Sequence, residues 1–122
     1  MTEHEHHWGS EVLDPLTPLA RELRHEIPAV LKGFAELHHA AMADGALDRK
    51  TKELIALAIA ISHRCDGCIA SHARAAAKAG ASRAEVAEAI GVSILMNGGP
   101  GTVYGPRALD AYDDFAEPTP SA

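Results

Sequence analysis

Two cysteines and a histidine lie within eight residues of one another, and their types and spacing suit thiol–disulfide chemistry. Cys65 and Cys68 are the only cysteines in the 122 residues, and His72 follows the second by four positions. On a helix, which turns by about 100° per residue, the three side chains fall within an arc of roughly 60°. Two thiols and a base on one face of a helix can form or break a disulfide.

The position of Cys68 favours its reactive form. A cysteine attacks as the thiolate, and an unperturbed thiol with a pKa of about 8.5 is only slightly ionised at neutral pH. The cysteine segment is expected to open a helix, whose unpaired N–H groups and macrodipole favour negative charge. His72 lies at i+4 from Cys68, so its ring can point back at that sulfur and take its proton.

Glu53 is a third candidate for the same site. In one continuous helix it would lie about 18 Å from Cys65, out of reach. If the chain reverses near His63–Arg64, two antiparallel helices bring Glu53 level with His72, where it would orient the imidazole and support its charge. The alternative interpretation is a solvated first-turn glutamate that stabilises its own helix dipole. The sequence leaves both open.

The elements around these residues are predicted to be helical throughout, with almost no strand signals. Asp48 is the expected N-cap of the helix that carries Glu53, and its apolar run Leu54–Ile61 predicts a helix surrounded on all sides. Ser82-Arg83-Ala84-Glu85 is a capping box. The glycine-rich segment 97–101 is expected to exclude helix. The expected helices span residues 16–26, 28–43, 49–62, 65–79, 83–96 and 106–115.

The sequence therefore predicts an all-α fold, a single domain of five or six helices. Residues 1–14 are expected to form a flexible, histidine-containing N-terminal tail, residues 15–116 the helical domain with its helical hairpin around the CxxC motif, and residues 117–122 a C-terminal tail. Two aromatic residues are of interest beside this core. Tyr104 is expected to be a packing anchor or to line a pocket. His38 is expected to be partly buried beside Phe34 and Leu37.

Composition excludes several classes of protein. The net charge of −6 leaves no basic stripe for nucleic acid. No apolar run approaches the roughly 20 residues that cross a bilayer, and residues 1–10 do not resemble a secretory signal. A cytoplasmic protein with no membrane partner is expected, and there a CxxC pair is more often catalytic or metal-binding than a permanent crosslink. Low aromatic content, 4%, predicts a thin core completed by self-association.

The pattern Glu53, eleven residues, Cys65-x-x-Cys68 and then His72 resembles the redox motif of the alkylhydroperoxidase D-like (AhpD-like) proteins of the carboxymuconolactone decarboxylase superfamily. The likeness covers residues 31–104, including the lead into the Glu53 helix and the glycine-rich segment before Tyr104. It implies an all-helical fold that assembles as trimers or hexamers. By position it also implies catalytic roles for all four motif residues.

The same resemblance implies an antioxidant oxidoreductase that acts on peroxide, without cofactor or metal. We expect Cys68, deprotonated by His72 with Glu53 behind it, to attack a hydroperoxide and become a sulfenic acid. Cys65 then condenses with it to a disulfide, which a dithiol reductant reopens by exchange. The inverse order, with Cys65 attacked first, stays open. The mycobacterial type has a histidine between the cysteines, where this chain has Gly67.

Three other interpretations remain at this point. The first is a carboxymuconolactone decarboxylase-like lyase or another non-redox member of the superfamily, which would not need the cysteines. The second is a zinc site in which Cys65, Cys68 and His72 are ligands and Glu53 or water is the fourth. The third is a non-catalytic helical oligomer whose cysteines are merely small buried residues.

Overall fold

The computed structural model describes residues 6–116, and this part of the chain is helical with no strand. The expected C-terminal tail and the first five residues of the expected N-terminal tail lie outside the described residues. The predicted all-α class, with six helices in one domain, is confirmed. Among residues 6–116, no helix is both long and apolar enough to span a membrane. The helices are α1 (Ser10–Glu26), α2 (Pro28–Met42), α3 (Arg49–Ser62), α4 (Asp66–Lys78), α5 (Arg83–Asn97) and α6 (Gly99–Ala116).

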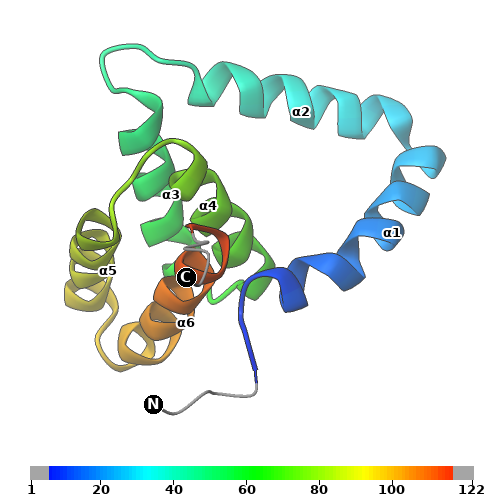
Figure 1. The fold of residues 1–122 in the computed structure, drawn as a ribbon. Helices are drawn as coiled ribbons and strands as arrows, with labels where there is room; N and C mark the ends of the chain where they lie inside the picture. The colour runs from blue at the N-terminus through cyan, green and yellow to red at the C-terminus, as the bar shows by residue number, and fades with distance from the viewer. Residues whose placement is uncertain (1–5, 117–122) are drawn as a thin grey trace, which may run out of the picture.

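Helices α3 to α6 form the core, and α4 packs between α3 and α6 (Figure 1). Small side chains allow this packing, because α4 buries alanines against buried alanines of α6. Larger apolar residues fill the remaining space, among them Leu57, Ile61 and Ile69. The Tyr112 hydroxyl donates to the carbonyl of Ala81 at 2.6 Å and thereby ties α6 to the segment before α5.

Two sequence-predicted caps are present where expected. The Asp48 side chain accepts from the Thr51 backbone N–H at 2.9 Å at the start of α3. At the start of α5, Ser82 and Glu85 form the reciprocal capping box, with both hydrogen bonds made. These caps satisfy donors that a helix N-terminus otherwise leaves unpaired.

The expectation that residues 97–101 exclude helix is wrong, because α6 begins at Gly99. Gly98, with a φ of 67°, ends α5 and reverses the chain. Pro100 lies in the first turn of α6, where its missing N–H would have had no helical partner. The glycines of this segment serve close packing instead: a Cβ at Gly101 would lie 2.8 Å from the Cα of Ile94 on α5.

Helix α1 also begins earlier than predicted, at Ser10 rather than residue 16. The Ser10 backbone N–H and hydroxyl both donate to the Asp114 carboxylate, at 2.8 and 2.9 Å. Gly9 is buried against the same end of α6. These contacts join residues more than 100 positions apart, so local sequence signals could not reveal them.

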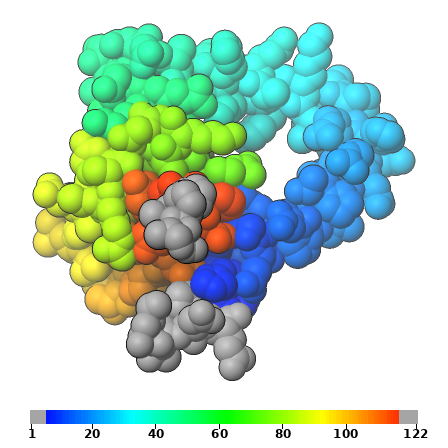
Figure 2. Space-filling model, in the orientation of Figure 1, coloured from blue at the N-terminus to red at the C-terminus, as the bar shows by residue number. Residues whose placement is uncertain are grey.

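Helices α1 and α2 form an arm that arches away from the core, and an open gap separates much of it from the core (Figures 1 and 2). Neither helix buries a single residue. Large apolar side chains nevertheless recur along the arm at helical spacing and are 39 to 64% exposed. They are Leu16, Leu19, Leu23, Ile27, Val30, Phe34 and Leu37.

The prediction that α3 is surrounded on all sides is wrong for the single chain. Leu57 and Ile61 are buried, whereas Ile55 and Ile59 are 45 and 50% exposed. Helices α4, α5 and α6 pack against α3, but the arm makes few contacts with it. One side of α3 is therefore left uncovered within the chain.

The glycines of α5 and α6 allow a matched test of this packing. Gly101→Ala should destabilise the fold by about 1–3 kcal/mol, because the new methyl group meets the α5 backbone. Gly91→Ala, on α5 with nothing within 4 Å of the new Cβ, should stabilise by about 0.5–1 kcal/mol through helix propensity. Urea unfolding measures both, and a Gly101→Ala protein as stable as the unsubstituted chain would contradict the close approach.

Candidate functional site

The site is built on the hairpin of α3 and α4, which reverses at the predicted position. Arg64 has a φ of 54°, an uncommon value for a residue other than glycine. The backbone N–H groups of His63 and Arg64 bond to carbonyls of the last turn of α3, at 3.0 Å each. Cys65 then caps α4. The two helices run antiparallel, so residues early in α3 lie beside the middle of α4.

This reversal brings Glu53 to His72, with 2.9 Å between Oε1 and Nδ1. The Glu53 side chain is completely buried and that of His72 is 23% exposed. The solvated-glutamate interpretation is therefore wrong, and the antiparallel one is correct. Because a carboxylate can only accept, the imidazole proton of this bond lies on Nδ1 and the lone pair of a neutral ring lies on Nε2.

Arg49 completes the surroundings of the buried carboxylate. Its guanidinium lies 3.7 Å from Glu53 Oε2, one helical turn earlier on α3. Oε2 has no hydrogen-bond partner among the described residues, so Arg49 compensates its charge without bonding to it. Arg49 was not among the site residues predicted from the sequence. The i,i+4 spacing of an arginine and a glutamate was the signal that could have found it.

Both cysteines lie at the N-terminus of α4 and are joined in a disulfide. The Cys65 sulfur accepts from the Cys68 backbone N–H at 3.2 Å. Cys68 is exposed and Cys65 is half-buried. In the reduced protein the same N–H groups and the positive end of the helix dipole would favour a thiolate at this position.

The zinc arrangement is not formed by these residues. Within residues 6–116, no group of three or more histidine, cysteine or acidic side chains is placed to hold a metal ion. Glu53 and His72 bond to each other, and the two cysteines share the disulfide.

A second, aromatic-lined ion pair anchors the start of α4. The Arg107 guanidinium of α6 bonds to both carboxylate oxygens of Asp66, at 3.1 and 3.0 Å. It lies 3.9 Å from the ring centroid of Trp8 and 4.5 Å from that of Tyr104. Tyr104 thus has the expected anchoring role. Asp66 and Arg107 were not predicted from the sequence, because no local pattern links residues 41 positions apart.

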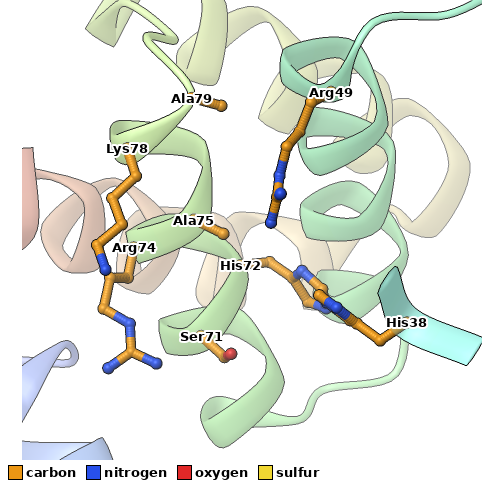
Figure 3. Close-up of a pocket in the computed structure, with 8 residues that line it drawn as sticks. All are labelled: His38, Arg49, Ser71, His72, Arg74, Ala75, Lys78 and Ala79. Atoms are coloured by element: carbon orange, nitrogen blue, oxygen red, sulfur yellow. The ribbon is translucent and has the colours of Figure 1, made fainter. Parts of the chain in front are cut away.

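A cavity of about 410 Å³ lies along α4 beside His72. His38 of α2 reaches its edge, and its ring is stacked 6.4 Å from that of His72. His38 is exposed, as are Phe34 and Leu37, so the expectation of partial burial is wrong. The reason is that α2 stands away from the core. Figure 3 shows His72, His38 and Arg49 on one side of α4.

Comparisons with known proteins agree on one family. The model of the carboxymuconolactone decarboxylase family matches residues 28–111. An uncharacterised protein of Cupriavidus necator is 40% identical over 70% of this chain and 76% of its own length. An uncharacterised protein of Haemophilus influenzae is 48% identical over 75% of this chain and 80% of its own length.

A solved structure gives the same result for the fold. The crystal structure of an apo carboxymuconolactone decarboxylase family protein from Legionella pneumophila has a TM-score of 0.85 to this chain. The two are 41% identical, and the likeness covers 88% of this chain and 96% of the other.

The Glu53 carboxylate is expected to set the tautomer of His72. In the unsubstituted protein, long-range ¹H–¹⁵N NMR should find the neutral ring protonated at Nδ1, because that atom donates to Glu53. Glu53→Ala removes the acceptor and should move the proton to Nε2. Glu36→Ala, an exposed glutamate on α2, is the matched control and should change nothing. An Nε2-protonated ring in the unsubstituted protein would contradict the assignment.

Proposed function

Since the chain belongs to the carboxymuconolactone decarboxylase family, we propose that it is a thiol-dependent peroxidase that reduces hydroperoxides through Cys65 and Cys68. The observation that carries the proposal is the bond between buried Glu53 and His72, one helical turn from a cysteine pair already joined as a disulfide. A buried carboxylate, an imidazole and two adjacent sulfurs are the groups that activate a thiol and cycle it.

In the first step, Cys68 acts as the nucleophile. Nε2 of His72 takes the Cys68 thiol proton, while Nδ1 stays bonded to Glu53. The thiolate attacks the terminal oxygen of the hydroperoxide and the O–O bond breaks. The sulfur is oxidised to a sulfenic acid, and the departing alkoxide takes the proton back from His72 and leaves as an alcohol.

In the second step, Cys65 attacks the Cys68 sulfur, and the sulfenic oxygen leaves as water. The product is the disulfide present in the structure. A dithiol then reduces it by two thiol–disulfide exchanges and is itself oxidised to a disulfide. The greater exposure of Cys68 supports its assignment as the sulfur that meets peroxide, and Cys65, its neighbour at the cap, as the resolving one.

Glu53 is a positioning residue in this scheme, since it acts through His72. Its burial excludes water from the bond and leaves the ring one fixed orientation. The Arg49 guanidinium, 3.7 Å from the other carboxylate oxygen, compensates the Glu53 charge at that depth. Loss of His72 or Arg49 would leave the buried Glu53 carboxylate with only one of these two compensating contacts.

Single cysteine substitutions test the order of events. With one equivalent of cumene hydroperoxide, Cys65→Ser should accumulate a sulfenic acid at Cys68, which a dimedone adduct and mass spectrometry detect. Cys68→Ser should give none and should not turn over with a dithiol, because it lacks the sulfur that meets peroxide. His72→Ala should slow sulfenic acid formation about 10²- to 10⁴-fold. Equal turnover by the unsubstituted and Cys68→Ser proteins would end the peroxidase proposal, and a sulfenate found only in Cys68→Ser would invert the order.

We also propose that copies of this chain associate, as a trimer or hexamer, through the arm. The apolar side chains of α1 and α2 are exposed, and so are Ile55 and Ile59 of α3, which the arm leaves uncovered. A second copy of the chain carries the same apolar surface and is always present with the first, so we propose that it covers this surface.

Light scattering on the eluting protein tests the assembly. The unsubstituted protein should have a mass of at least three times 12.9 kDa. Phe34→Glu places a charge on the apolar stripe and should lower that mass, whereas Lys32→Glu, on the same helix outside the stripe, should not. Circular dichroism checks that each variant keeps its helices. A monomeric unsubstituted protein would contradict the proposal.

A further inference from the structure

The cavity along α4 collects positive charge in an acidic protein. The chain has a net charge of −6, with 17 acidic and 11 basic residues. The cavity is nevertheless lined by three permanent cations, Arg49, Arg74 and Lys78, and by two imidazoles. Among its lining residues there is no carboxylate, and only Arg49 of the three cations has one beside it, that of buried Glu53. Such a lining attracts anions at short range, against the sign of the whole molecule.

The cations that line the cavity lie on both sides of α4, and alanines lie between them. Figure 3 shows Arg74 and Lys78 on one side of α4 and Arg49 on the other, with Ala75 between them. The small alanine side chains leave room, and the volume of about 410 Å³ is in the usual range for a small-molecule site.

Arg74 and Lys78 are not neutralised within the described part of the chain. Neither pairs with a carboxylate of residues 6–116, whereas Arg83 and Arg107 do. Arg74 makes a cation–π contact with Phe115, with 5.8 Å between its Cζ and the ring centroid. Lys78 lies in the last turn of α4, where its charge also interacts favourably with the helix dipole. Arg74 lies in the middle of the helix, where the dipole does not favour a cation.

The cavity and the cysteines share one face of α4. Cys68, Ser71, Ala75 and Lys78 follow one another at steps of three or four residues, so they form a single stripe. At 1.5 Å per residue, Arg74 lies about 9 Å and Lys78 about 15 Å along the axis from Cys68. A ligand held at one end of this stripe therefore reaches the cysteine only if it is several bonds long.

We propose that the cavity binds the carboxylate of an organic hydroperoxide whose peroxide end lies at Cys68. This rests on the proposed peroxidase function and names its substrate class. The planar fork of Arg74 matches a carboxylate, and Lys78 adds a point charge on the same side of α4. Holding the far end of the molecule places the terminal oxygen at the thiolate, which converts a bimolecular encounter into a positioned one.

A binding measurement tests the site apart from any turnover. Octanoate, which carries no peroxide, should bind the oxidised protein in calorimetry, and methyl octanoate should not. The double variant Arg74→Gln, Lys78→Gln should weaken octanoate binding at least tenfold. Arg24→Gln, Lys32→Gln removes the same charge from the arm and is the matched control, with binding unchanged. Equal binding by both double variants, or equal binding of acid and ester, would overturn the site.

A kinetic comparison links the site to the reaction. A fatty-acid hydroperoxide should have a higher kcat/KM than its methyl ester in the unsubstituted protein and in the arm control, and this preference should be lost in Arg74→Gln, Lys78→Gln. Octanoate binding without turnover of any peroxide would refute the peroxidase function and, with it, this substrate class. Turnover of cumene hydroperoxide without preference for the acid over the ester would refute the carboxylate site alone.

Discussion

The burial of one carboxylate is the constraint on which the rest of this structure depends. Glu53 is completely enclosed, and an enclosed charge is costly unless its partners are supplied by the protein. His72 bonds to one oxygen and Arg49 stands near the other. Because Glu53 and His72 lie on different helices of the hairpin, their bond also fixes the register of α3 against α4. The same bond leaves Nε2 of the ring as its proton acceptor.

The register is maintained by close helix packing around α4. Alanines on α4 and α6 bury their faces together, and Gly101 and Gly105 allow α6 to approach α5. A core of small side chains removes little apolar surface from water, and the large apolar residues of the arm and of one side of α3 remain exposed because the arm stands away from the core. The chain that positions the site thus also leaves an apolar surface exposed on the arm and on α3.

Local signals predicted the parts of the fold that are encoded locally. The reversal near Arg64, the cap at Asp48 and the capping box follow from spacing within a few residues. The meeting of Glu53 with His72 was one of two interpretations that the sequence left open, and the structure decides between them. The errors concern distant contacts. No residue near Ser10 in the sequence indicates its bonds to Asp114. The glycine-rich start of α6 has the composition of a loop, and its close packing against α5 involves residues that local patterns do not link. The cationic cavity was missed for the same reason, since its cations come from two helices.

The two ends of α4 have different electrostatic surroundings, with the cysteines at its N-terminus and two cations toward its C-terminus. At the N-terminus, helix N–H groups and the dipole favour a thiolate, and Arg107 neutralises Asp66 so that its carboxylate does not oppose that charge. Toward the C-terminus, Arg74 and Lys78 supply the positive charge on which the proposed carboxylate site depends. The net charge of −6 repels anions at long range, but salt screens that field beyond about 8–10 Å. Recognition of the proposed anionic substrate would therefore depend on cations close to the place where it binds, and Arg74 and Lys78 line the cavity about two and three turns of α4 from Cys68.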